Sequence, residues 1–148
     1  SLSAGAGNTA TQRITYSIQE ATHIAVSGDP APMLVTAATP GAEPVPVTEA
    51  STRYSIASNA GEDSKKITAA LDRDLPAGVH LEVHLAPPDG NATSTRRALS
   101  SRAADLVMNI DNVAVTNQPI TYTLRADPTA PKLVGGTLLV TYTITNQI

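Results

Sequence analysis

The residues best suited to chemistry lie in the stretch HLEVH, residues 80–84. His80, Glu82 and His84 alternate with apolar residues, so on a β-strand their three side chains share one face. Imidazole and carboxylate groups of this kind are common zinc ligands. The sequence offers no identifiable fourth ligand beside them, and His23 is far away along the chain. Because alternation alone places polar side chains on a solvent-facing strand surface, we predict neither a metal site nor a bound cofactor.

Acidic pairs and hydroxyl groups are the next candidates for catalysis. Asp72 with Asp74, and Glu62 with Asp63, are close enough in sequence to suggest an acid and a base. They lie in stretches typical of loops, and no aromatic platform for a sugar accompanies them. The chain has no Cys and no Gly-x-Ser-x-Gly motif for an activated serine. We therefore predict that the protein is not an enzyme, and keep a small secreted enzyme that uses the His80 face as an alternative.

Two expected loops carry motifs for modification or binding. The sequence NAT at 91–93 is an Asn-x-Thr motif directly after a turn, which makes Asn91 a candidate acceptor for glycosylation. The sequence RRALSSR at 96–102 groups three arginines that could contact an acidic partner. Short basic clusters on loops are usually solvated, so the second motif predicts no specific ligand.

Size, charge and composition narrow the class of protein further. A chain of 148 residues can form one domain that buries roughly 70% of its unfolded surface. The 10 basic and 13 acidic residues give a net charge of −3, and no basic cluster is interleaved with aromatic residues, which argues against a nucleic-acid partner. No run of about 18 apolar residues occurs, so we expect no membrane span. The absence of Phe and Trp, with abundant Thr and Pro, suits an extracellular β-protein better than a metabolic enzyme.

Three stretches of the chain nearly repeat one another: RITYSIQ at 13–19, PITYTLR at 119–125 and LVTYTIT at 139–145. They contain three of the four tyrosines. In each stretch, apolar residues and tyrosine alternate with polar residues. Strand side chains alternate between faces, so each stretch is predicted to be a strand with one buried face. The repetition could also reflect nothing more than neighbouring strands built from the same good β-formers.

Short strands separated by turn residues account for most of the remaining chain. Residues 101–113 break the two-residue period, because Leu106, Val107 and Ile110 have helical spacing. We predict an all-β fold, an immunoglobulin-like β-sandwich of about eight strands with one short helical turn, with a closed barrel as the alternative. The other predicted strands are 22–28, 32–38, 52–58, 65–72 and 79–85. Residues 44–49, with prolines at alternate positions, are predicted to be an edge segment or an extended linker.

Four segments, taken in order, carry a family resemblance: ITYSIQEATHIAVSGDP, KKITAALDRDLPAGVHLEV, ADLVMNIDNVAVTNQPITYTL and GGTLLVTYTIT. Together they resemble secreted bacterial β-sandwich proteins of the spore-coat-U and fimbrial type, over most of residues 12–145. In that group, subunits polymerise by donor-strand complementation, in which one subunit inserts a strand into the next. Pilins of the group commonly carry a disulfide, whereas this chain has no Cys. The resemblance implies a secreted or cell-surface homopolymer.

The N-terminal region is where this implication applies. Residues 1–11 are predicted to form a flexible arm rich in Gly, Ala and Ser, and residues 12–148 a single β-sandwich domain. Residues 12–19 are the candidate donor strand. The residues expected to face the neighbouring subunit are Ile14, Tyr16 and Ile18. We expect a structural subunit of an extracellular filament or pilus, and the alternative is a monomeric secreted or cell-surface binding module for a glycan or a protein.

Overall fold

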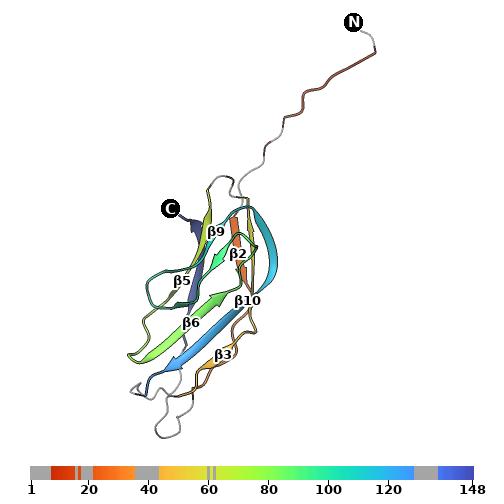
Figure 1. Cartoon of the computed structure of the whole chain (residues 1–148). Helices are drawn as coiled ribbons and strands as arrows, with labels where there is room; N and C mark the ends of the chain where they lie inside the picture. The colour runs from red at the N-terminus through yellow and green to blue at the C-terminus, as the bar shows by residue number, and fades with distance from the viewer. Residues whose placement is uncertain are drawn as a thin grey trace.

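Two antiparallel β-sheets packed face to face make up the computed structural model of the protein (Figure 1). The structure describes residues 8–15, 17, 22–35, 44–59, 61, 63–128 and 137–148. These residues form ten strands and no helix, so the predicted all-β sandwich is confirmed. Consequently, the described residues include no helix with the length and hydrophobicity needed to cross a membrane.

The strands divide unequally between the two sheets. They are β2 (Thr22–Val26), β3 (Val47–Glu49), β4 (Arg53–Ser58), β5 (Lys65–Leu71), β6 (Val79–Leu85), β7 (Thr93–Ser94), β8 (Arg97–Ala98), β9 (Ala104–Ile110), β10 (Val113–Ala126) and β11 (Val140–Asn146). The six-stranded sheet has the order β2-β4-β10-β6-β8, with β3 also paired to β10. The four-stranded sheet has the order β11-β5-β9-β7.

Strand β10 links the upper and lower halves of the larger sheet. Its first half pairs with β4, and its second half pairs with β6 and β3. The register shifts between Val115 and Gln118, where Asn117 has a left-handed backbone with φ 57°. Such a bulge bends a strand and increases its twist, which lets one long strand serve both halves of the sheet.

The core lies between the inner faces of the sheets and consists almost entirely of aliphatic side chains. On β6, Leu81, Val83 and Leu85 are buried, as their two-residue spacing predicts. In a chain without Phe or Trp, Tyr54 is the largest fully buried side chain. Its hydroxyl donates a hydrogen bond to the carbonyl oxygen of Ala86, which satisfies the one polar group that the ring brings into the core.

The predicted helical turn within 101–113 is wrong. Residues Ala104–Ile110 form β9 instead, and Leu106, Val107 and Ile110 are fully buried there. The register of β9 against β5 shifts twice, and Asn109 has a left-handed backbone with φ 61°. Bulges of this kind disturb the two-residue alternation, so a strand can bury residues whose spacing imitates a helix.

Two predicted strands also differ from the structure. Residues 32–35 lie outside any strand, and the rest of the predicted strand 32–38 is outside the described residues. In the first repeated stretch, residues 13–15 and 17 lie outside any strand as well. Alternation in a sequence predicts which side chains share a face of a strand, but not which chain that strand pairs with.

Candidate functional site

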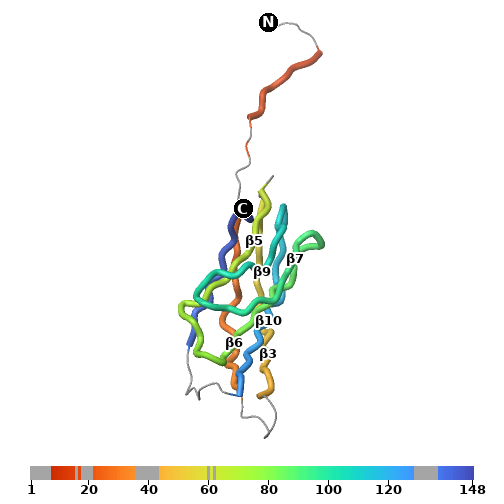
Figure 2. The backbone as a smooth tube through the Cα atoms, turned by 60° about the vertical axis from the view of Figure 1, so that its left-hand side comes forward, coloured from red at the N-terminus to blue at the C-terminus, as the bar shows by residue number. Residues whose placement is uncertain are grey.

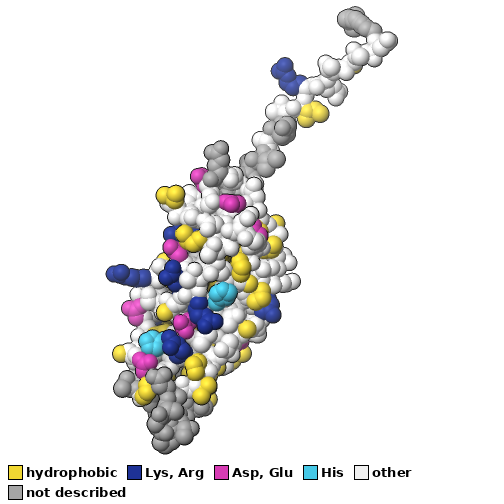
Figure 3. Space-filling view, in the orientation of Figure 1, with side chains coloured by type: hydrophobic (Ala, Val, Ile, Leu, Met, Phe, Trp, Pro, Cys, Tyr) yellow, Lys and Arg dark blue, Asp and Glu magenta, His cyan; other side chains and the backbone are white. Residues whose placement is uncertain are grey.

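The histidine face of β6 makes polar contacts with β10 and with the residue that follows it. Arg125 of β10 donates from Nε to Glu82 Oε1 at 3.1 Å, and His80 Nε2 lies 3.2 Å from Asp127 Oδ2. Histidine, arginine and acidic side chains lie interspersed on the face shown in Figure 3. Among the described residues, no group of three His, Cys, Asp or Glu side chains is placed to hold a metal ion. Here the glutamate that could have joined His80 and His84 as a ligand contacts an arginine.

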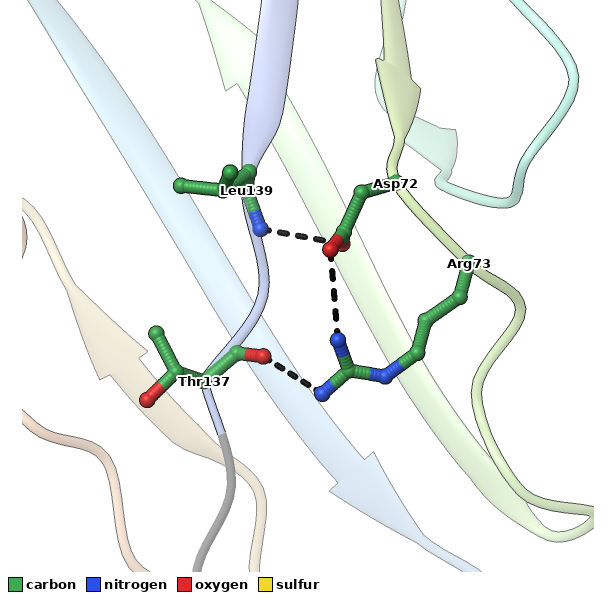
Figure 4. A network of polar contacts seen from close by, with 4 residues as sticks. All are labelled: Asp72, Arg73, Thr137 and Leu139. Atoms are coloured by element: carbon green, nitrogen blue, oxygen red, sulfur yellow. Dashed lines mark hydrogen bonds and ion pairs between the residues drawn. The ribbon is translucent and has the colours of Figure 1, made fainter.

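The aspartates after β5 hold backbone segments in place. Asp72 Oδ1 accepts a hydrogen bond from the backbone N–H of Leu139 at 3.1 Å, and Asp72 Oδ2 lies 3.2 Å from Arg73 Nη1 (Figure 4). Arg73 Nη2 donates to the carbonyl oxygen of Thr137. Asp74 accepts the N–H of Ser101 at 2.7 Å, and this bond holds the pKa of its carboxyl below the ordinary value. Asp72 and Arg73 therefore anchor the chain where it enters β11.

The candidate glycosylation motif lies on a surface turn. Asn91 is exposed, and the Asp89 side chain accepts hydrogen bonds from the N–H groups of Asn91 and Ala92, both at 2.9 Å. Thr93, the third residue of the motif, is exposed at the start of β7. The Asn91 side chain is therefore accessible.

The described residues of the first repeated stretch, 13–15 and 17, lie outside the sandwich. Residues 8–15 and 17 are exposed, and the described part of this segment extends away from the two sheets in Figures 1 and 2. The side chain of Ile14 is 80% exposed, which is unusual for a residue in a well-patterned β sequence. Tyr16 and Ile18, the other two predicted donor residues, lie outside the described residues.

The two long sides of the sandwich are built differently. On one side, the sheets end in β7 and β8, which have two residues each. On the other side, they end in β2 and β11, which lie side by side (Figure 2). Within the described residues, β2 pairs only with β4, and β11 pairs only with β5. We call the side bordered by β2 and β11 the seam.

A groove of about 430 Å³ opens in the seam where β2 has ended. One wall comes from residues 26–33, which follow and include the end of β2, and the other from residues 137–142. The floor belongs to the inner face of the larger sheet and includes Leu81, Ile120 and Leu124. We call this space the seam groove. Its mainly apolar lining and its volume, within the range of roughly 300–1,000 Å³ found for ligand pockets, make it suited to apolar side chains.

A buried carboxylate fixes the first wall. Glu49 is 8% exposed and accepts hydrogen bonds from the backbone N–H groups of Ser51 and Ala31, each at 2.7 Å. The Ser51 hydroxyl adds a bond to the same carboxylate at 2.8 Å. The bonds from Ser51, together with that from Ala31, hold the pKa of the Glu49 carboxyl below its ordinary value. The segment after β2 is therefore held to β3 by a hydrogen bond to the Glu49 carboxylate and not by backbone pairing between strands.

Two tyrosines and one threonine that line the groove carry hydroxyl groups. Tyr122 of β10 and Tyr142 of β11 meet with their hydroxyl oxygens 2.6 Å apart, which joins the two sheets across the seam. Burial raises the pKa of both tyrosines, so these hydroxyls stay neutral. Thr52 also lines the groove, but its Oγ1 is buried and faces away from the open space; among the described residues it has no hydrogen-bond partner, like the buried hydroxyls of Thr22, Ser58 and Ser94. A buried hydroxyl without a partner is uncommon in folded proteins.

Sequence reasoning found part of this site. The repeated stretches pointed to Tyr122 and Tyr142, but nothing in their spacing showed that they meet across two sheets. Thr52 and Glu49 were missed, because a buried threonine or glutamate has no local pattern that distinguishes it from an exposed one. The two prolines of PVPVTE did indicate an edge element. That element is β3, whose last residue is Glu49.

No protein-family model, no curated protein and no solved structure matches this chain. The resemblance to spore-coat-U and fimbrial proteins therefore remains a prediction. The function has to be inferred from the exposed arm and the seam groove.

Proposed function

We propose that the protein is a secreted structural subunit of an extracellular filament, in which residues 12–19 of one copy insert into the seam of the next. One observation carries the proposal. The described part of an alternating apolar stretch, residues 13–15 and 17, is exposed, with Ile14 at 80%, while the seam has two edge strands and an apolar groove beyond the end of β2. These two features support the assignment of residues 12–19 as donor and of the seam as acceptor.

The free edge of β11 supplies the backbone partner. Residues Val140–Asn146 pair with β5 on one side only, within the described residues, so the other side offers unpaired N–H and C=O groups. An added strand would pair with these groups, while its alternate side chains enter the groove. The inward side chains of β11, which include Val140 and Ile144, are only partly buried and would gain cover.

Burial of the donor face provides the driving force. Ile14 and Ile18 would each contribute about 1.5–3 kcal/mol if fully buried in the seam. Ordering the arm costs roughly 1–2 kcal/mol per residue for the backbone, so the strand needs the backbone ladder as well as apolar contacts. Because the arm and the seam are different surfaces, the contact is head-to-tail, and it builds an open chain when two copies do not exchange their arms reciprocally.

The test compares two single-residue variants in the arm. Ile14→Asp places a charge on the donor face, whereas Thr15→Asp places the same charge on the opposite face. Negative-stain microscopy should show filaments that withstand SDS for the wild type and Thr15→Asp, and none for Ile14→Asp. Equal behaviour of the two variants, or a wild type without filaments, contradicts the proposal.

The seam groove favours one other function. Its volume of about 430 Å³ would also suit a small apolar ligand or a ligand side chain, as in a monomeric binding module. In that case the wild type stays monomeric at high concentration in light scattering, and filaments are absent from micrographs.

A further inference from the structure

We propose that Arg13 of one copy forms an ion pair with Asp29 of the next copy, at the rim of the seam groove, and so sets the register of the inserted strand. The inference rests on the proposed filament function and names the charge pair that aligns the two subunits. Within one subunit, both residues are exposed. Both side chains are therefore accessible to another copy.

Apolar burial alone leaves the register of the donor strand open. Its apolar residues, which begin at Ile14, recur every two residues, so a slip of two residues still presents an apolar face to the groove. Register in a sheet is weakly specified when alternative pairings bury equivalent side chains. Complementary charges across an interface favour one register, because a slip separates each charge from its partner.

The donor side of the pair is Arg13, which carries the one charged side chain of residues 1–19. Arg13 directly precedes Ile14, so on an extended strand the two side chains point to opposite faces. When Ile14 enters the groove, Arg13 stays on the solvent side, where its long side chain can lie along the rim and keep its charge hydrated. Among the described residues, Arg13 has no ion pair or hydrogen bond.

The acceptor side of the pair is Asp29, the only charged side chain among the described residues that line the seam groove. It is exposed, and its carboxylate has no ion pair or hydrogen bond within the described part of the chain. The two other carboxylates beside the groove are engaged. Glu49 accepts the N–H of Ala31 at 2.7 Å, and Asp72 lies 3.2 Å from Arg73. Asp29 is thus the carboxylate that is left for a cation from another copy.

The subunit's own arginine near this rim is also engaged elsewhere. The N–H of Ser27 donates to the carbonyl oxygen of Arg53 at 2.9 Å, so Arg53 belongs to the strand beside the segment that carries Asp29. Its guanidinium, however, donates to the carbonyl oxygens of Ala50 and Thr52, at 2.8 and 3.1 Å. Arg53 therefore does not form an ion pair with Asp29.

Charge reversal on the full chain tests the pair. Arg13→Glu and Asp29→Lys each replace an attraction by a repulsion, and the double variant restores the attraction with the signs exchanged. Arg96→Glu and Asp63→Lys are the matched controls, because they change the net charge equally at exposed residues outside the groove lining.

The measured quantity is the subunit concentration above which filaments form. Each reversal should raise this concentration about twofold to tenfold relative to its control, the range expected when an exposed ion pair becomes a like-charge pair. The double variant should return to within about twofold of the wild type. In about 1 M salt, where the Debye length is about 3 Å, the differences should shrink.

The subunit without assembly provides the second measurement. In the Ile14→Asp background, Asp29→Lys should leave the temperature of unfolding unchanged, because the carboxylate has no partner among the described residues of one subunit. A lower unfolding temperature would show that Asp29 acts inside the subunit and would overturn the inference. So would filaments that respond to the two reversals no more than to the controls, or effects of the reversals that multiply in the double variant. A wild type that forms no filaments would instead refute the proposed function, and the ion pair with it.

Discussion

The two long sides of the sandwich both end in edge strands, but these strands differ in length. We call the side bordered by β7 and β8 the closed side. There, the connection between β6 and β9 crosses from one sheet to the other. Leu99 of this connection is 5% exposed and inserts into the core, and its N–H donates to the carbonyl of Leu81 at 2.8 Å. The edge strands there, β7 and β8, have only two residues each. Short edges are a usual means of preventing association with other chains.

Within the described residues, the edge strands of the seam are not shortened in this way. Strand β11 has seven residues, and its outer edge is not paired. In the groove beside it, Glu49 bonds the backbone of one wall, and Asp72 and Arg73 bond the backbone of the other. The two sides therefore differ in the length of the strand edge that they expose, and the proposed strand addition uses the longer one. Four changes would break or sharpen this comparison.

Deletion of residues 1–19 should have the largest effect, and only on assembly. The described residues of this segment, 8–15 and 17, pair with nothing in the sandwich, so the free energy of unfolding of the remaining chain should change little. Filaments should be absent in micrographs, and a synthetic peptide spanning Asn8–Glu20 should bind the truncated chain in fluorescence polarisation. Deletion of residues 1–7 serves as the control. Normal filaments from the longer deletion would show that another strand is donated.

Leu99→Ala on the closed side should lower the stability of the subunit and leave assembly unchanged. Loss of a buried leucine leaves a cavity, so unfolding by denaturant should require about 2–5 kcal/mol less free energy. Filaments formed by the folded variant should have normal morphology, because the seam is untouched. A variant of normal stability that fails to assemble would place the subunit contact on the closed side.

Acidification should loosen the first wall of the seam groove. The pKa of Glu49 in the folded protein lies below its ordinary value of 4.5, so its contribution to stability is complete above that value and is lost as the pH falls through the lower, folded pKa. Thermal unfolding measured from neutral to acidic pH should show this loss, and Glu49→Gln should remove that part of the pH dependence. An unchanged pH profile in Glu49→Gln would mean that the carboxylate does not hold the wall.

The smallest effect is expected on the histidine face. His80→Ala combined with His84→Ala should change the free energy of unfolding by no more than about 0.5 kcal/mol and leave assembly unaltered, because exposed ion pairs contribute little. Calorimetry with zinc checks the same face. One equivalent of bound zinc that is lost in the double variant would establish a metal site there.

The sequence predicted the core better than the edges. Alternation located the inward residues of β6, β10 and β11, since burial on one face leaves a local signal in each strand. The same rule misread Leu106, Val107 and Ile110 as helical, because bulges are set by pairing between strands and not by local sequence. It also predicted a strand over residues 32–38; residues 32–35 lie outside any strand, and Pro32 and Met33 instead line the seam groove next to Ala31, which is bonded to Glu49.

The candidate site was predictable only from the donor side. Ile14, Tyr16 and Ile18 are visible as an alternating stretch after a Gly- and Ala-rich arm. The seam groove depends on the bond between Ala31 and the Glu49 carboxylate and on the meeting of two tyrosines from different sheets, and these are contacts between residues far apart in the sequence. Such contacts follow from the topology, which alternation does not determine.

Strand β2 gives the proposed filament a polarity. The arm joins β2 at Thr22, opposite Ser58, while the seam groove begins at Val26, opposite Tyr54, at the other end of the strand. A stack of such subunits has two unlike tips, one with an unused arm and one with an empty groove. A labelled Asn8–Glu20 peptide should cap only the tip with the empty groove, and labels at both tips in micrographs would contradict a polar assembly.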